Sequence, residues 1–438
     1  MNQALEIKSV SKAPAHVVLR PLSLRSNVVW TGIGLAVYYG SQYLVLPLIA
    51  KLTDAATVGQ YAMGLAITAP IIVFSQMQFR QLQVTDVSGE YSFGDYFWTR
   101  IYCTFAAILV ILGLICFSSY SPAMRLTVVL IAITKALESL SDLAYGNIQK
   151  YDRMDKVAVA MCCRGIFSTL AFGALLVITH KLAPAVAGVG TVWAAILIGY
   201  ELPNARRISG RAERITAPSS GIVQRLLRMG MVIAVTSTLV SFSGNLSCYY
   251  LDRYCGHASV GLFTAASTSL GVMALVAGAL SQGTLARASV YYASRDTRSL
   301  FGLFFKVSSL LLGVSLAFVV VLVLIGKPIV SILFRPSYGS IVLPMIIMAA
   351  GVSVNMLGAF AVSILMIARR FNLFLACTIA MLLTQVVASR LLIPQYGVIG
   401  AAWTEAIRYC VAMLALNAVA LFVFRRHLAA APSAGEKE

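Results

Sequence analysis

Three charged residues lie close together inside an apolar stretch of the chain. Lys135, Glu138 and Asp142 occupy positions i, i+3 and i+7, which places all three on one face of a helix. A charge at the centre of a bilayer costs roughly 2.5 to 3.5 kcal/mol, so it persists only where it faces protein or water. This face therefore predicts either the floor of a polar cavity, which meets an anionic substrate or relays a proton, or a static buried ion pair.

Further charges interrupt other apolar stretches. Arg164 lies in the stretch that follows, at a depth that makes an ion pair with Glu138 sterically possible. Glu405 and Arg408, at positions i and i+3, repeat the arrangement near the end of the chain. These two side chains either satisfy each other or face a second part of a cavity.

Arg80 lies where the second apolar stretch ends, with Asp86 and Arg100 nearby. It either receives a phosphate at the mouth of a cavity or faces solvent and the phosphates of membrane lipids. The sequence holds no HExxH motif, no phosphate-binding loop and no nucleophile elbow, and its eight cysteines lack the spacing of a metal site. These features favour transport over catalysis, and we expect no cofactor and no resident metal.

The composition identifies the elements that must position these charges. Of 438 residues, 59% are apolar and only 11% are charged, whereas a soluble domain has about 25% charged residues. The net charge of +18 would suggest a nucleic-acid partner in a soluble chain. Here the charges lie at the ends of long apolar runs, which excludes nucleic acid and indicates an integral membrane protein.

About twelve stretches are long enough to cross a membrane. Of the 34 Lys and Arg residues, 24 fall on the side of the two termini and six on the other side, so both termini are expected in the cytoplasm. The predicted spans are Val28 to Ala50, Tyr61 to Phe79, Ile101 to Phe117, Leu126 to Gly146, Val157 to Thr179, Ala185 to Tyr200, Met229 to Tyr250, Gly261 to Gly283, Leu303 to Ile325, Ile341 to Ile367, Phe371 to Ile393 and Val398 to Phe424.

An internal repeat divides these spans into two groups of six. The segment 56–61 before the second span resembles the segment 258–263 before the eighth, at an offset of 202 residues. Copies six helices apart share one orientation, so the halves should be related by a pseudo-twofold axis along the membrane normal. The predicted organisation is a cytoplasmic tail (1–27), a first lobe (28–200), a basic cytoplasmic linker (201–228), a second lobe (229–424) and a cytoplasmic tail (425–438).

Two segments resemble a known family. The first runs from Gln78 to Asp86 and is followed by Asp95, Tyr96 and Arg100. The second runs from Lys135 to Asp142 and continues through Tyr145, Gly146, Gln149, Met154, Asp155, Arg164 and Gly165. Both are similar to the corresponding loops and helices of bacterial polysaccharide transporters, which flip lipid-linked sugars and belong to the multidrug, oligosaccharidyl-lipid and polysaccharide exporter superfamily.

The resemblance implies that the chain translocates an undecaprenyl-diphosphate-linked oligosaccharide across the bacterial inner membrane, for O-antigen, capsule or exopolysaccharide synthesis. Alternating access of two lobes would move the cargo, with Arg80, Lys135, Arg164 and Arg408 as candidate cations for its diphosphate. Glu138, Asp142 and Glu405 would pair with these cations or carry a coupling ion, either protons or sodium.

The expected partners are the lipid-linked oligosaccharide, membrane lipids and, as candidates, a polysaccharide polymerase and ligase. Two alternatives stay open. A drug or metabolite antiporter of the same superfamily would bind organic cations, and a membrane enzyme of polymer assembly would transfer sugars.

Overall fold

The computed structural model describes residues 22–86, 89–209, 217–268, 270, 271, 273, 288, 290–292, 294, 296–368 and 370–429. These residues form helices and connecting turns, without a strand in the described ranges. The tail residues 1–21 and 430–438, part of the predicted linker and most of the predicted span Gly261 to Gly283 lie outside them.

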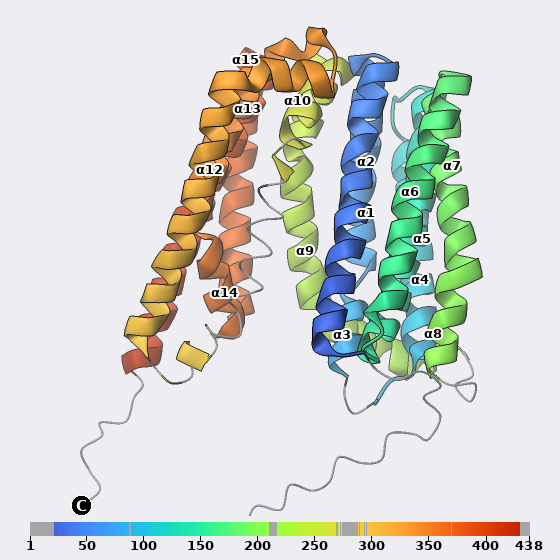
Figure 1. Cartoon of the computed structure of the whole chain (residues 1–438), viewed down its shortest axis with the longest axis vertical. Coiled ribbons are helices and arrows are strands. Elements are labelled where there is room, and N and C mark those ends of the chain that lie inside the picture. Colours follow the sequence, from blue (N-terminus) through green and yellow to red (C-terminus); the bar gives the residue numbers. More distant parts are fainter. Residues whose placement is uncertain are drawn as a thin grey trace, which may run out of the picture.

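We call helices α1 to α8 the N-lobe and helices α9 to α15 the C-lobe. Their helices are α1 (Leu24–Leu52), α2 (Ala55–Ser75), α3 (Phe79–Thr85), α4 (Phe93–Cys116), α5 (Pro122–Lys150), α6 (Met154–Thr179), α7 (Leu182–Ile196), the π-helix η1 (Leu197–Glu201), α8 (Leu202–Ser209), α9 (Ser220–Cys255), α10 (His257–Thr268), α12 (Thr297–Leu333), the 3₁₀ helix η2 (Pro336–Ile341), α13 (Val342–Met356), α14 (Ala359–Ile367) and α15 (Phe371–Ala429). In Figure 1, α9 lies between α2 and the group formed by α12 to α15.

Local sequence signals begin these helices. The Asp54 carboxylate accepts the Thr57 N–H at 2.8 Å at the start of α2, and Ser92 and Asp95 form a capping box at the start of α4. Inside α15, Gly397 has φ +53°, which breaks the helix. The chain reverses at Gly397, so α15 supplies two membrane spans, as the sequence predicted.

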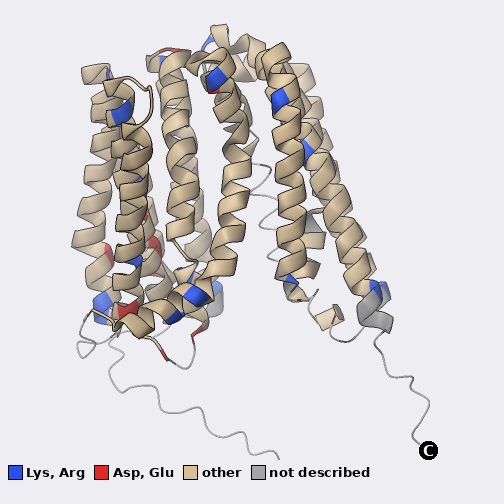
Figure 2. Ribbon diagram, turned by 180° about the vertical axis from the view of Figure 1, so that it is seen from behind, with Lys and Arg blue, Asp and Glu red and all other residues tan. Residues whose placement is uncertain are grey.

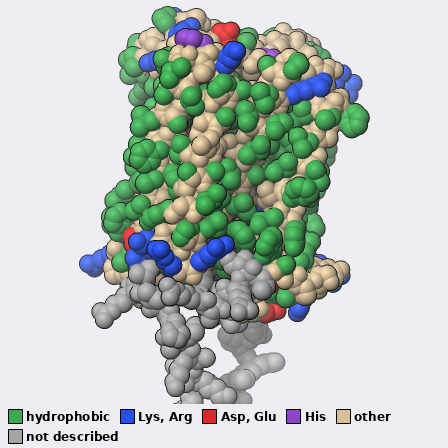
Figure 3. All heavy atoms as spheres, turned by 90° about the vertical axis from the view of Figure 1, so that its right-hand side faces the viewer, with side chains coloured by type: hydrophobic (Ala, Val, Ile, Leu, Met, Phe, Trp, Pro, Cys, Tyr) green, Lys and Arg blue, Asp and Glu red, His purple; other side chains and the backbone are tan. Residues whose placement is uncertain are grey.

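Nine helices among the described residues are long and apolar enough to cross a membrane. Helix α5 has 29 residues, enough for about 43 Å at 1.5 Å per residue. Figure 3 shows hydrophobic side chains over the middle of the molecule and Lys and Arg near its two ends. The chain is therefore a helical protein that crosses the membrane many times, as predicted.

We call the end of the bundle where α1 begins and α15 ends the terminal face, and the other end the opposite face (Figure 1). At the opposite face a single apolar cluster contains residues of both lobes, among them Val58, Val260 and Tyr338. Towards the terminal face, the cluster around Leu143 includes Leu226 and Ala234 of α9, whereas the cluster around Leu416 consists mostly of residues of α12, α14 and α15. The N-lobe and helices α12 to α15 are thus joined at one end and diverge towards the other, while α9 stays packed against the N-lobe.

The repeated segments meet at this joined end, which we call the seam. A Cβ atom added to Gly59 would lie 1.7 Å from the His257 carbonyl oxygen, and one added to Gly261 would lie 2.1 Å from the Ala55 carbonyl oxygen. These two contacts are equivalent under the 202-residue offset, since 257 corresponds to 55 and 261 to 59. The starts of α2 and α10 therefore cross as pseudo-symmetric mates, as a twofold axis along the membrane normal requires.

Candidate functional site

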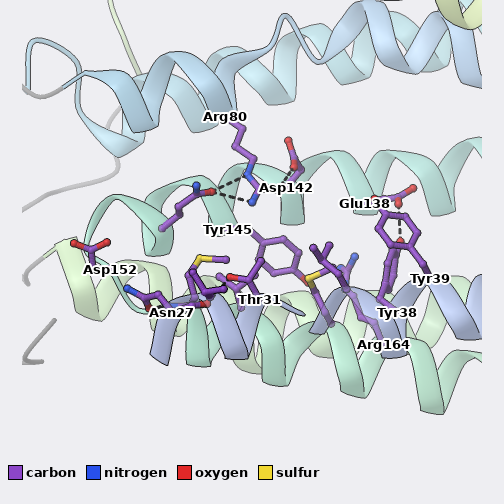
Figure 4. A pocket seen from close by; sticks show the side chains of 16 residues that line it. Asn27, Thr31, Tyr38, Tyr39, Arg80, Glu138, Asp142, Tyr145, Asp152 and Arg164 are labelled. Atoms are coloured by element: carbon purple, nitrogen blue, oxygen red, sulfur yellow. Dashed lines mark hydrogen bonds and ion pairs between the residues drawn. The ribbon is translucent and has the colours of Figure 1, made fainter. Parts of the chain in front are cut away.

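A cavity of about 490 Å³ lies inside the N-lobe between α1, α3, α5 and α6. It extends from Asn27 and Asp152 at the terminal face to Tyr38, Glu138 and Arg164 deeper in the lobe (Figure 4). A volume of this size is typical of small-molecule sites. The cavity therefore has room for the head group of a ligand within the membrane-spanning part of the protein.

Helix α5 supplies the acidic wall of the cavity. Glu138, Asp142, Tyr145 and Gln149 line it from successive turns of one helix face. The helix continues to Lys150, so Asp142 and Glu138 lie about 12 and 18 Å from its end at 1.5 Å per residue. Figure 2 shows acidic residues at this depth inside the N-lobe, while many Lys and Arg residues lie near the terminal face.

Arg80 reaches the cavity from α3. Its Nη1 atom lies 2.8 Å from Asp142 Oδ1, and its Nη2 atom donates to Gln149 Oε1 at 2.9 Å. Met77 and Gln78, with φ of +46° and +51°, turn the chain back into α3. A Cβ on Gly146 would lie 3.0 Å from Arg80 Cγ, so the absence of a side chain there lets α3 approach α5. The structure thus brings Arg80 and Asp142, two predicted site residues, into contact.

Lys135 and Glu138 form a second ion pair, deeper on α5. Lys135 Nζ lies 2.7 Å from Glu138 Oε2, and the two side chains are 28% and 30% exposed. The Tyr38 hydroxyl of α1 donates to Glu138 Oε1 at 2.6 Å. Glu138 lines the cavity, whereas Lys135 lines a separate pocket of about 30 Å³, and Tyr38 ties Glu138 to α1.

Arg164 forms the most deeply buried ion pair. Its Nε atom lies 2.8 Å from Glu201 Oε1, and its guanidinium also donates to Ser141 and lies 4.9 Å from the centre of the Trp193 ring. The Tyr145 hydroxyl donates to the same Glu201 carboxylate at 2.6 Å. Arg164 therefore stands at the back of the cavity with its charge already neutralised.

This pairing differs from the expected ion pair between Arg164 and Glu138. Helical structure continues from α7 through η1 into α8, to Ser209, and buries Glu201 completely. The predicted linker began at residue 201, so Glu201 was not among the predicted partners of Arg164. The wider π-helical turn, which ends at Glu201, is the local feature that no hydropathy pattern indicated.

The remaining predicted residues, Glu405 and Arg408, lie in the C-lobe, outside this cavity. Arg408 donates to Glu405 Oε2 at 2.6 Å, while Ser247 and Gln385 donate to Glu405 Oε1 at 2.9 and 2.8 Å. Glu405 is 5% exposed. Its carboxylate connects α9 to the segments of α15 before and after Gly397. In this structure Glu405 therefore holds helices together.

Most residues that line the cavity were not predicted as site residues, among them the polar residues Tyr38, Gln149 and Asp152. Tyr38 gave no signal beyond an ordinary aromatic residue in a span, and Gln149 was part of a family motif without a role assigned to it. Asp152 lies in the turn after α5. Among the described residues, no group of three or more His, Cys, Asp or Glu side chains could hold a metal ion.

Comparison with known proteins identifies the family. The model of a family described as "Polysaccharide biosynthesis protein" matches residues 24–286. The chain is also similar to the capsular polysaccharide biosynthesis protein CapF of Staphylococcus aureus, with 23% identity over 376 residues that cover 85% of this chain and 93% of that protein.

Two solved structures share the fold. The inward-facing conformation of a multidrug resistance MATE family transporter of the MOP superfamily aligns with a TM-score of 0.71 and 12% identity, over 93% of this chain and 100% of that chain. The lipid II flippase MurJ, in an inward closed conformation, aligns with a TM-score of 0.72 and 13% identity, over 92% of this chain and 91% of that chain.

The two solved structures are of a multidrug transporter and of a flippase, and the likeness shows that this chain has their fold, as predicted. The family match covers more than half of the chain, so the chain belongs to the polysaccharide biosynthesis protein family.

Proposed function

We propose that this protein flips an undecaprenyl-diphosphate-linked oligosaccharide from the cytoplasmic to the outer leaflet of a bacterial inner membrane. Two half-buried ion pairs with carboxylates of α5 carry the proposal: Arg80 and Asp142, which both line the N-lobe cavity, and Lys135 and Glu138, of which Glu138 lines it. Arg80 and Asp142 are 32% and 31% exposed, and Lys135 and Glu138 are similarly exposed. Each cation is accessible, and each is held by a carboxylate that an incoming anion can replace.

A diphosphate suits these two cations. Arginine binds phosphate oxygens through two parallel N–H groups, and lysine binds them as a point charge. Arg164 is a weaker candidate than the sequence suggested, because its guanidinium is buried and occupied by Glu201. We therefore assign first contact with the head group to Arg80 and Lys135, and we assign to Arg164 the support of the cavity wall.

The orientation follows from charge. Lys and Arg residues are concentrated on the side of the termini, which is the cytoplasmic side under the positive-inside rule. The cavity would then take cargo from the cytoplasmic leaflet while the seam closes the outer end. Translocation requires the seam to open and the terminal face to close, and protons or sodium ions are the candidate coupling ions.

The test is leaflet-specific labelling of lipid-linked oligosaccharide in cells that lack the protein and in cells that carry variants. We expect the lipid to accumulate in the cytoplasmic leaflet without the protein, and with Arg80→Gln or Lys135→Gln at normal protein abundance. Lys181→Gln, an exposed cation outside the cavity, is the matched control. Normal lipid distribution and normal surface polymer in the deletion strain would overturn the proposal.

A second candidate function is an antiporter for drugs or metabolites. Its support is the fold, which aligns with a multidrug resistance transporter over 93% of this chain, together with the carboxylates of the same cavity. Thermal unfolding of the purified protein discriminates the two functions. Stabilisation by a prenyl diphosphate favours the flippase, whereas stabilisation by organic cations alone favours the antiporter.

A further inference from the structure

Arg100 is a completely buried arginine next to the cavity wall. It lies on α4, and its Nη1 atom donates to Ser139 Oγ on α5 at 3.0 Å. Its Nε and Nη2 atoms have no hydrogen-bond partner among the described residues. The guanidinium lies 5.4 Å from the centre of the Phe79 ring. A buried cation with two unused donors is costly, so its retention calls for a state in which those donors are used.

The nearby acidic group is Asp142, whose carboxylate acts electrostatically on Arg100. Ser139 and Asp142 are one turn apart on α5, so they lie on neighbouring parts of the same helix face. Arg100 is seven residues into α4 and Asp142 eight residues from the end of α5, so both lie roughly 10 to 12 Å from the helix ends at the terminal face. In the structure Asp142 is bonded to Arg80.

An anionic head group that binds Arg80 must displace the Asp142 carboxylate. Without a second cation, this carboxylate would remain beside the phosphate and repel it. Arg100 offers such a cation at the same depth, with N–H groups that are not engaged elsewhere in the described residues.

We propose that Arg100 is the alternative counter-ion of Asp142: when a diphosphate takes Arg80, the Asp142 side chain turns to Arg100. Arg100 is then a positioning residue, because it acts on the cargo only through Asp142. This inference rests on the proposed function, since it requires an anionic cargo at Arg80. It also explains why two arginines and one carboxylate lie together in this part of the N-lobe.

A double-mutant cycle on the purified full-length protein tests the inference, with farnesyl diphosphate as the probe in titration calorimetry. The proteins are the wild type, Arg100→Gln, Asp142→Asn and the double variant. We expect Arg100→Gln to weaken binding about tenfold, a factor typical of coupled sites. In the Asp142→Asn background the same substitution should change the affinity less than about twofold, because no carboxylate remains to be neutralised.

An equal loss of affinity in both backgrounds would overturn the inference, because it would show a direct or purely structural role for Arg100. An unchanged affinity of Arg100→Gln would overturn it as well. If this single variant fails to accumulate, Arg100→Met combined with Asp142→Asn still decides: it must bind like Asp142→Asn alone, and weaker binding contradicts the inference. Failure of the wild type to bind farnesyl diphosphate would instead contradict the proposed function itself.

Discussion

The seam at the opposite face yields a prediction about the conformational equilibrium. In Gly59→Ala the new Cβ would start 1.7 Å from the His257 carbonyl oxygen, and real Cβ atoms keep at least 3.0 Å, so the helices must separate by at least 1.3 Å. In Gly261→Ala the corresponding shift from the Ala55 oxygen is at least 0.9 Å, from 2.1 to 3.0 Å. The opposing atoms belong to backbone, so no side chain can turn aside to absorb the change.

Overpacking of this kind costs about 1 to 3 kcal/mol. The cost applies only while the seam is closed, so it shifts the equilibrium towards the state with the seam open by roughly 5- to 150-fold. Gly59→Ala should have the larger effect, since its required displacement is larger. Gly244→Ala in α9 is the matched control, because a Cβ there meets nothing within 4 Å.

Double electron–electron resonance measures the shift directly. Spin labels are introduced at two exposed positions, 181 between α6 and α7 and 327 near the end of α12, in a variant without the eight native cysteines. These ends of α7 and α12 lie at the opposite face (Figure 1). We expect longer distances to gain population in both seam variants and not in Gly244→Ala. Identical distance distributions in wild type and both folded seam variants would refute the reasoning, because they would show that this contact does not hold the lobes together.

Three further predictions concern stability. Arg164→Gln and Glu201→Gln should each lower the free energy of unfolding by about 3 to 5 kcal/mol, because each leaves a buried charge without its partner. The double substitution should cost less than the sum of the two single losses. Additive losses in thermal unfolding would contradict this. Glu405→Gln should destabilise the C-lobe without changing the affinity for farnesyl diphosphate, and a calorimetric change in affinity would show that the C-lobe cluster contacts cargo. The Thr57 N–H holds the pKa of Asp54 below its usual value, so the stability from this cap is present at neutral pH and is lost as pH falls through the lowered pKa. Asp54→Ala should therefore cost about 1 kcal/mol at pH 7 and progressively less below about pH 4, while Asp54→Asn, which caps without a charge, should unfold without this pH dependence.

Much of the fold was predictable because hydropathy and repetition report on membrane spans directly. The repeated segments around Gly59 and Gly261 indicated a twofold axis, and the structure places these same segments in contact with each other. The repeat could be recognised without knowing which residues are in contact, because it is a pattern along the sequence itself.

The pairing of charges was less predictable. Lys135 and Glu138 are one turn apart on one helix, so their contact follows from helix geometry alone. The contact of Arg80 with Asp142 depends on the left-handed turn at Met77 and Gln78 and on the close approach at Gly146. These are tertiary features, and spacing along the chain carries no signal for them.

Helix α9 packs closely against the N-lobe with one half of its length and against α15 with the other half. Near the terminal face, Gly230 lies so close to the turn between α2 and α3 that a Cβ would be 2.3 Å from the Met77 carbonyl oxygen. Further along, Ser243 and Ser247 are bonded to Gln385 and Glu405 of α15.

If α12 to α15 swing relative to the N-lobe, α9 cannot follow both neighbours as a straight rod. It must flex between Gly230 and Ser243 or give up one set of contacts. The boundary between the parts that move relative to each other therefore crosses the middle of α9. A stiffer α9 would slow each cycle of the proposed transport, although every charged residue would be unchanged.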